Sequence, residues 1–233
     1  IYGGDGTSDP GVDGADEIHA GGGSDTVFGE GGDDVIYAEV GDDTVQGGDG
    51  DDSIYGAEGA DTLYGNAGDD TISGGIDDDT LRGGIGADTL SGDSGSDTLY
   101  GDDQDDSLDG GDGDDALYGG SGADTLIGGL GADTIDGGAD TDTITGGGGS
   151  DTITAGSGDD VIDGGDGDDT ITAGIGADTI TGGAGADTFV FTYDDFLDDQ
   201  VDLIKDFTVG SGGDVLDLSA LHSASLAAGF GDS

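Results

Sequence analysis

The nine residues GGDGDDTIT, at positions 164–172, are one copy of the unit that decides the fold of this 233-residue chain. Residues 11–190 divide without remainder into twenty such units with the pattern G-G-x-G-x-D-x-U-x, where U is a large apolar residue. The sixth place is Asp and the eighth place is apolar in all twenty units. The fourth place is Gly in seventeen units and is Asp77, Gln104 or Asp140 in the other three. A repeat this strict indicates a solenoid, in which each unit buries its apolar face against its neighbours.

Each unit has a glycine-rich turn part and a short extended part. The extended part, x-U-x, is rich in Thr, Ile, Leu and Val, which favour β-strands. Because side chains alternate along a strand, the eighth place is predicted to face inward and its two neighbours to face water. We expect a three-residue strand and then a six-residue turn, in which glycines supply the positive φ that reverses the chain. Two nonapeptide units then form one flattened coil. The predicted fold class is an all-β, right-handed parallel β-roll of ten coils with two parallel sheets.

The repeat divides the chain into three segments. Residues 1–10 are predicted to be an irregular N-terminal segment, residues 11–190 the β-roll, and residues 191–233 a C-terminal capping segment richer in large apolar side chains. Within the cap, residues 202–207 and 214–219 are expected to form strands that close the open end, because a bare sheet edge pairs readily with other chains. The first two residues, Ile1 and Tyr2, fit the eighth and ninth places of a preceding unit, so we expect more chain upstream.

The composition narrows the class of partner. The chain carries 56 acidic and 2 basic residues, for a formal charge of −54, which excludes nucleic acid as a partner and disfavours anionic lipid. It has no Cys, and no apolar run approaches the ~20 residues needed to insert into a membrane. Only 31% of the residues are hydrophobic, which by itself would predict disorder. The strict repeat and this polyanionic composition are compatible if a divalent cation neutralises the charge.

The sixth-place aspartates are the candidate metal ligands. Oxygen ligands without Cys, and with only two His, select Ca²⁺ or Mg²⁺, and turns rich in backbone carbonyls favour Ca²⁺ because it accepts 6–8 oxygens in loose geometry. In the coil arrangement each turn stacks on the turn two units later, so a cation between two turns can take carbonyls and an Asp from both. The ligands on one edge are Asp16, Asp34, Asp52, Asp70, Asp88, Asp106, Asp124, Asp142, Asp160 and Asp178. Those on the other edge are Asp25, Asp43, Asp61, Asp79, Asp97, Asp115, Asp133, Asp151, Asp169 and Asp187.

Ten stacked turns leave nine gaps at each edge, which sets a ceiling of about 18 Ca²⁺ ions. Their charge would offset two thirds of the −54. Without them the core, one row of apolar side chains from each sheet, is too thin for the chain to fold, so we expect folding and binding to be one event. The units that depart from the pattern, residues 74–82, 101–109 and 137–145, are expected to make weaker or empty sites.

Other acidic and aromatic residues have less specific interpretations. The fifth-place aspartates, such as Asp33 and Asp51, alternate with Ala and Ser and are interpreted as surface charge. Tyr37, Tyr55 and Tyr64 are close in sequence and face outward, so they form either a patch for sugar or protein or simply good outer strand residues. The Thr-x-Thr segments at 143–145, 152–154, 170–172 and 179–181 resemble ice-binding arrays, but they are expected to alternate between faces, which disfavours ice binding.

The sequence predicts no catalytic residues. His19 and His222 are too far apart to form a metal or catalytic pair and are interpreted as exposed bystanders. Acid–base chemistry needs two carboxylates in unlike environments, which a uniform lattice of aspartates does not provide. We therefore expect that the chain is not an enzyme.

These nonapeptides resemble the RTX (repeats-in-toxin) calcium-binding β-roll over residues 11–190, and residues 202–219 resemble the C-terminal flank of such repeats in secreted bacterial proteases. The resemblance implies a secreted, extracellular protein of a Gram-negative bacterium, exported unfolded by type I secretion machinery, with Ca²⁺ sites of roughly 10⁻⁴–10⁻³ M affinity. The expected function is a calcium-binding structural module that folds on binding extracellular Ca²⁺. The alternatives are the C-terminal tail of a secreted RTX enzyme (protease, lipase or alginate-modifying), with its catalytic domain upstream, and an adhesin or biofilm spacer.

Overall fold

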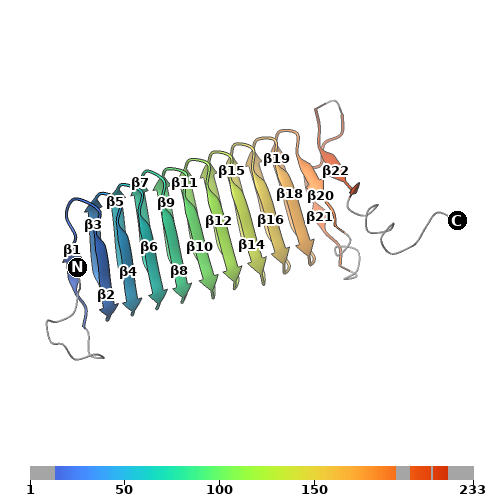
Figure 1. Cartoon of the computed structure of the whole chain (residues 1–233). Coiled ribbons are helices and arrows are strands. Elements are labelled where there is room, and N and C mark those ends of the chain that lie inside the picture. The colour runs from blue at the N-terminus through green and yellow to red at the C-terminus, as the bar shows by residue number, and fades with distance from the viewer. Residues whose placement is uncertain (1–13, 193–199, 211, 220–233) are drawn as a thin grey trace.

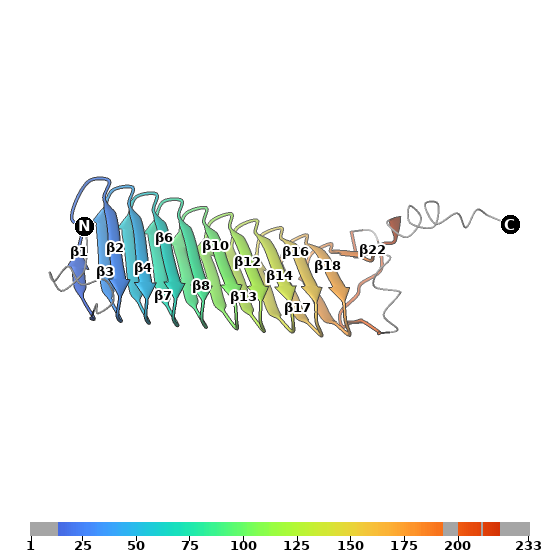
Figure 2. The same ribbon diagram turned by 60° about the horizontal axis from the view of Figure 1, so that its bottom comes forward.

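The computed structural model describes residues 14–192, 200–210 and 212–219. The chain forms a parallel β-solenoid whose coils stack along one axis, with β1 at one end of the stack and β22 at the other (Figure 1). Two parallel sheets of 11 strands each face one another, and successive strands alternate between them. The view in Figure 2 shows the same stack turned about the horizontal axis. The prediction of an all-β fold with two parallel sheets is confirmed.

The odd-numbered strands form the first sheet, here called the odd sheet. They are β1 (Glu17–His19), β3 (Val35–Val40), β5 (Ser53–Glu58), β7 (Thr71–Ile76), β9 (Thr89–Ser94), β11 (Ser107–Asp112), β13 (Thr125–Leu130), β15 (Thr143–Gly148), β17 (Val161–Asp166), β19 (Thr179–Ala184) and β21 (Leu203–Ile204).

The even-numbered strands form the second sheet, here called the even sheet. They are β2 (Thr26–Gly31), β4 (Thr44–Asp49), β6 (Thr62–Ala67), β8 (Thr80–Ile85), β10 (Thr98–Asp103), β12 (Ala116–Ser121), β14 (Thr134–Ala139), β16 (Thr152–Ser157), β18 (Thr170–Ile175), β20 (Thr188–Val190) and β22 (Val215–Asp217). Within the part of the chain that the structure describes, no helix has the length and apolarity to span a membrane.

The strand length differs from the sequence prediction. Each full strand has six residues rather than three, and covers places seven to nine of one unit and places one to three of the next, as in β4. The turn is correspondingly short and covers places four to six. The reason is that parallel pairing continues past the apolar residue: Gly48 pairs with Asn66, just as Val45 pairs with Leu63. Glycine at the second place therefore belongs to the ladder rather than to the turn.

The core is a single file of eighth-place side chains from each sheet. All twenty are buried, from Ile18 and Val27 to Ile180 and Phe189, as predicted. The register is fixed at two nonapeptide units per coil, so that Leu99 lies beside Leu81 on one side and Leu117 on the other.

The C-terminal end of the roll is closed by β21 and β22, which add one strand to each sheet. Phe207 packs on Phe189, the last residue of the apolar file, with 5.9 Å between ring centroids. The predicted cap is thus formed by two strands that belong to different sheets. Residues 1–10 lie outside the described part of the chain.

The second and fourth places require a left-handed backbone. At the fourth place Gly86 has φ of 145°, and a Cβ there would collide with the carbonyl oxygen of Gly68 in the preceding coil. The three non-glycine residues at the fourth place also have a positive φ, which is 79° at Asp77, 84° at Gln104 and 76° at Asp140. Side chains other than Gly are disfavoured in this conformation, and Asn and Asp tolerate it best. Gln104 is therefore the most strained of the three.

Replacing Gln104 by glycine is expected to stabilise the roll. The change Gln104→Gly removes a left-handed non-glycine residue, whose cost is roughly 1–2 kcal/mol, and keeps the bond from its backbone N–H to Ser121 O (2.7 Å). The matched control is Asp112→Gly, an exposed strand residue at the third place with ordinary φ, which should lose roughly 0.5–1 kcal/mol. Urea unfolding in excess Ca²⁺ measures both. If Gln104→Gly lost as much stability as Asp112→Gly, the conclusion that the backbone of Gln104 is strained would be wrong.

Candidate functional site

The sixth-place aspartates lie at the two edges of the roll, each directly before a strand. Their carboxylates point inward, and the eighteen from Asp34 to Asp187 are only 0–3% exposed. Asp16 and Asp25, in the first coil, are partly buried. The structure therefore brings the predicted residues into two columns, with successive members separated by two nonapeptide units, as the coil arrangement predicts. Burial of so many carboxylates is costly unless each is hydrogen-bonded or paired with positive charge.

One oxygen of each carboxylate from Asp34 to Asp187 joins neighbouring coils. The Oδ1 atom of Asp97 accepts a hydrogen bond from the backbone N–H of Asp79 at 2.7 Å, and the backbone N–H of Asp97 donates to Oδ1 of Asp115 at 2.8 Å. The same bond recurs from Asp16 to Asp187 along both edges. It fixes the orientation of the carboxylates from Asp34 to Asp187, so the second oxygen of each faces an equivalent volume.

That second oxygen, Oδ2, is buried without a hydrogen-bond donor. Among the described residues this holds for Asp16, Asp34, Asp43, Asp52, Asp61, Asp70, Asp79, Asp88, Asp97, Asp106, Asp115, Asp124, Asp133, Asp142, Asp151, Asp160, Asp169 and Asp178. A Cβ atom on Gly92 would meet Asp97 Oδ2 and, at 2.5 Å, the carbonyl oxygen of Gly110 in the next coil. Two acceptor oxygens thus share the space that the missing side chain leaves. Glycine keeps this space open in most units, whereas Ala20, Ala38, Ala155 and Ala173 place a Cβ there.

Burial changes the acidity of these carboxyl groups. Desolvation raises the pKa to about 7 for Asp70, Asp79, Asp97, Asp106, Asp142 and Asp178, and to about 6 for Asp52, Asp61, Asp88, Asp133 and Asp169. The backbone hydrogen bond opposes this rise in pKa, and nearby aspartates along the column add to it. Without a cation, the folded protein therefore disfavours the charged form of these carboxyl groups. A bound cation would favour the charged form instead.

The donor set at each edge consists of one carboxylate per turn and backbone carbonyls. No group of three acidic, His or Cys side chains converges on one point within the described ranges, so an ion here must also use carbonyl oxygens. The carbonyl oxygens of second- and fourth-place residues lie close to the next coil: a Cβ on Gly84 would meet Asn66 O, and a Cβ on Gly86 would meet Gly68 O. Hard oxygens in flexible geometry, beside an unpaired buried carboxylate oxygen, fit Ca²⁺.

The fifth-place aspartates were interpreted from the sequence as surface charge, but they also have a structural role. They are exposed, as expected, but every one of them also joins two coils. Oδ1 of Asp78 accepts a bond from the N–H of Ser96 at 2.8 Å, and Asp33, Asp42, Asp51, Asp69, Asp105, Asp114, Asp159 and Asp168 bond the equivalent N–H in the same way. The fifth-place bond runs to the following coil, whereas the sixth-place bond runs to the preceding one. The two rows together connect the turns in both directions.

The sequence reasoning also missed two aspartates in the cap. Asp202 Oδ1 accepts a bond from Asp178 N–H at 3.1 Å, and Asp214 Oδ1 accepts one from Asp187 N–H at 3.2 Å. They thereby continue the two sixth-place columns by one step. The signal was present: residues 202–205 and 214–217 keep the D-x-U-x half of the unit without its glycine turn. Asp206 further accepts bonds from the N–H groups of Gly182 and Gly183 at 3.0 and 2.9 Å.

Of the two interpretations of the tyrosines, a single patch of Tyr37, Tyr55 and Tyr64 is wrong. Tyr37 and Tyr55 stack with 5.2 Å between centroids in the odd sheet, and His19 stacks on Tyr37 at 4.7 Å, whereas Tyr64 belongs to β6 in the even sheet. Odd and even units face opposite ways, so nearness in sequence was misleading. The Thr-x-Thr segments do alternate between the sheets, in β15, β16, β18 and β19.

The two histidines are interpreted from sequence as exposed bystanders. The His19 side chain is 55% exposed and pairs with Glu39, whose hydrogen bond is the main cause of its raised pKa. His222 lies outside the described residues.

Comparison with known proteins adds a family match. The model of the RTX calcium-binding nonapeptide repeat matches residues 10–45, 39–72, 46–81, 82–117, 91–126, 118–153 and 154–189. A solved structure with similarity is a hyperactive, Ca²⁺-dependent, β-helical antifreeze protein from an Antarctic bacterium, with 22% identity, a TM-score of 0.39, and coverage of 78% of this chain and 72% of that one. No curated protein matches the chain.

Proposed function

Because the chain belongs to the RTX calcium-binding nonapeptide repeat family, we propose that this calcium-binding β-roll is a structural module that folds when it meets extracellular Ca²⁺. The observation that carries the proposal is the row of eighteen buried Oδ2 atoms without a donor. When bound, Ca²⁺ supplies the positive charge that such oxygens require. The chain's own contribution is to hold one carboxylate oxygen and backbone carbonyls ready in each gap between coils.

The ligands that we propose are the sixth-place aspartates, from Asp16 to Asp187, with up to about 18 ions between stacked turns. The continuation of the columns to Asp202 and Asp214 adds one candidate gap at each edge. The units at 74–82, 101–109 and 137–145 remain the predicted weak points. Their fourth-place residues keep positive φ, so the carbonyls stay in place and the expected weakness is strain rather than loss of a ligand.

Secretion is the context that best fits this chemistry. RTX repeats are typical of secreted bacterial proteins, and a chain of −54 charge with a thin core would remain unfolded at low cytosolic Ca²⁺, as export through a type I channel requires. We propose no catalytic role for this segment, because its buried carboxylates share one environment whereas acid–base chemistry needs two unlike ones. A catalytic domain (protease, lipase or alginate-modifying) or an adhesive domain upstream is the alternative source of activity. A catalytic or adhesive motif in any chain that precedes Ile1 would distinguish these.

A pair of aspartates in mid-roll tests the ligand assignment. Asp97→Ala removes a buried carboxylate that we propose serves the gaps on both sides of its turn. The Ca²⁺ stoichiometry should therefore fall by about two ions, and the Ca²⁺ concentration at the midpoint of folding should rise several-fold. The control Asp78→Ala removes an exposed fifth-place carboxylate that bonds only Ser96 N–H, with an expected cost of about 1 kcal/mol and unchanged stoichiometry. Calorimetric titration gives both quantities. Equal stoichiometry in the two variants would overturn the assignment.

A further inference from the structure

A hollow of about 380 Å³ opens on the outer face of the even sheet, over β6, β8 and β10. Its floor is Gly84, which lies between Asn66 and Asp102 in the column of second-place residues. The hollow exists because this position lacks a side chain while both of its neighbours in the column carry one. Its volume is at the low end of the ~300–1,000 Å³ typical of small-molecule sites. None of its lining residues is a sixth-place aspartate, so it is distinct from the calcium edges.

The same column contains a second hollow, of about 300 Å³, where Gly48 lies between Glu30 and Asn66. Its lining includes Phe28 but no basic residue, and its acidic side chains have no cation beside them among the residues that line it. The hollow over Gly84 differs because Arg82 contributes to it. Which of the two hollows is the better candidate for a ligand site therefore depends on the contacts that Arg82 makes.

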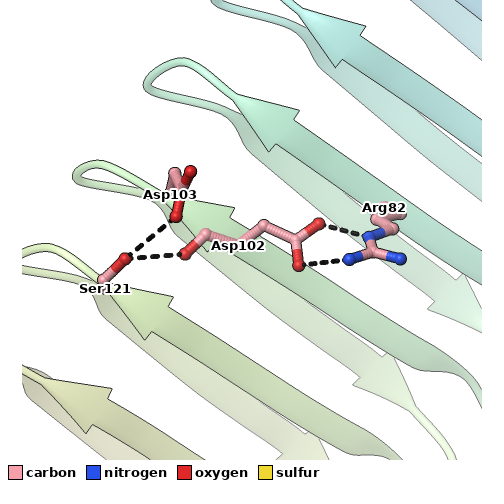
Figure 3. Close-up of polar contacts among 4 residues, drawn as sticks. All are labelled: Arg82, Asp102, Asp103 and Ser121. Atoms are coloured by element: carbon pink, nitrogen blue, oxygen red, sulfur yellow. Dashed lines mark hydrogen bonds and ion pairs between the residues drawn. The ribbon is translucent and has the colours of Figure 1, made fainter.

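The walls of the hollow over Gly84, here called the Arg82 pocket, are fixed by their own contacts. The Arg82 guanidinium reaches along the sheet to Asp102: Nη2 donates to Oδ1 at 2.8 Å, and Nε donates to Oδ2 (Figure 3). Next to Asp102 in β10, Asp103 accepts a bond from Ser121 Oγ at 3.1 Å, as Figure 3 also shows. A bidentate Arg–carboxylate pair holds its geometry well. The pocket is therefore largely formed before any ligand arrives.

The charge of the pocket is only partly balanced, because its lining carries Arg82 against Asp102 and Asp103. Arg82 is one of only two basic residues in the chain, and its charge is paired with Asp102. The guanidinium has five N–H donors, so it retains donors beyond the two that Asp102 uses. The Asn66 amide offers both a donor and an acceptor, and Asp103 offers further acceptors. The lining thus presents a paired cation, a neutral amide and one further carboxylate, with a net formal charge of −1.

The apolar part of the lining comes from Tyr64 and Ile85. Ile85 is 57% exposed, which leaves much of a large apolar side chain open to a ligand. The tyrosines of the other described ladders stack in pairs, Tyr37 on Tyr55 and Tyr100 on Tyr118 at 4.9 Å, so each has a ring face covered by its partner. Tyr64 has no aromatic stacking partner among the described residues, and its column neighbours are Gln46 and Arg82. Among the described tyrosines, the ring of Tyr64 is therefore the one that no stacked aromatic ring covers, and it can pack against a ligand.

We propose that the Arg82 pocket binds one neutral hexopyranose unit of a glycan. A sugar ring combines an apolar C–H face with hydroxyl groups that both donate and accept, which matches Tyr64 and Ile85 beside Asn66, Arg82 and Asp103. A polyanion is repelled by the net negative charge that remains when up to about 18 Ca²⁺ ions offset two thirds of the −54, and a basic peptide would be attracted all over the acidic surface without needing this hollow. The site is independent of the Ca²⁺ ligands but requires the folded roll.

The test is a calorimetric titration of the Ca²⁺-saturated protein with the methyl glycosides of glucose, galactose and mannose. At least one is expected to bind saturably, with one site per chain. Tyr64→Thr should weaken that binding by about tenfold. The matched control Tyr118→Thr changes the same place of the same sheet outside the pocket and should leave binding within about twofold. Both variants should fold, because Thr154 and Thr172 already occupy this place in later coils.

A second pair separates binding from stability. Asn66→Gly removes the amide but installs the residue that most units carry at this left-handed position (φ 83°), so the roll should be at least as stable while sugar binding is lost. Ala57→Gly makes the same backbone change in the odd sheet (φ 84°) and should not alter binding. Absence of binding by all three glycosides to the folded wild type would overturn the proposal. Equal weakening in the Tyr64 and Tyr118 variants would also overturn it.

Discussion

Chelation of Ca²⁺ is expected to unfold this protein completely. The metal-free roll contains eighteen buried Oδ2 atoms without donors and a core only one side chain deep on each sheet, so little opposes chain entropy and charge repulsion. Far-ultraviolet circular dichroism in chelator should therefore show a disordered chain. Titration with Ca²⁺ should restore the β-signal in a cooperative step at or below the millimolar range, because each carboxylate joins two coils.

Magnesium is the control for this titration. It demands near-ideal octahedral geometry and gives up its water reluctantly, whereas the gaps offer mainly backbone carbonyls, so Mg²⁺ at the same concentration should restore little of the signal. A chain with full β-structure in chelator would contradict the coupling of folding to binding. Equal midpoints for Mg²⁺ and Ca²⁺ would contradict the choice of Ca²⁺.

Acid is expected to favour folding of the metal-free chain. Burial raises the pKa of Asp97 and Asp79 in the folded roll to about 7, above the 3.8 of an unperturbed aspartate. The folded form therefore binds protons more tightly than the unfolded chain between pH about 4 and 7, and stability falls as pH rises through this window. In chelator, lowering the pH from about 8 to about 5 should consequently increase the β-signal. A protonated, neutral carboxyl group can also donate a hydrogen bond from its Oδ2–H to the neighbouring backbone carbonyl oxygen.

The Ca²⁺-saturated protein provides the matched comparison. Its ligands must be deprotonated, so the same acidification should raise the Ca²⁺ concentration needed for folding. The two forms thus have opposite pH dependence, measured by dichroism along one pH series with chelator and one with Ca²⁺. A metal-free chain that loses β-signal on acidification would show that desolvation of the sixth-place carboxylates is not what limits its folding.

The fold could be predicted largely from the repeat, because each unit solves the same local problem. Eighth-place residues such as Leu99 had to be buried, since they are the only regular apolar positions, and the register followed from two units per coil. Strand length could not be predicted from propensity. Glycine-rich places one to three do not favour strands in isolation, yet the neighbouring coils supply hydrogen-bond partners that hold Gly48 and Asn66 in the ladder.

The placement of the candidate ligands in two columns could be predicted from the sequence, but their bonding could not. Aspartate fills every sixth place, and this identified Asp97 and its equivalents as candidate ligands. The pattern does not show which carboxylate oxygen bonds a neighbouring coil and which is left without a hydrogen-bond donor. The coil-joining role of Asp78 and the other fifth-place residues is invisible to local pattern reading, because their hydrogen bonds join residues two units apart. Asp202 and Asp214 were missed because they lack the glycine turn that marks the other units.

The unit GGDGDDTIT, repeated in register, by itself determined the period, the apolar file and the two columns of aspartates, because these depend only on chain geometry and on the identity of side chains at fixed places. Stacking of the coils decided the rest. It set the direction of each inter-coil bond, separated Tyr64 from Tyr37 and Tyr55, and joined Arg82 to Asp102 beside a glycine floor. Such features arise between side chains that are distant in sequence and become neighbours only when the parallel strands pair.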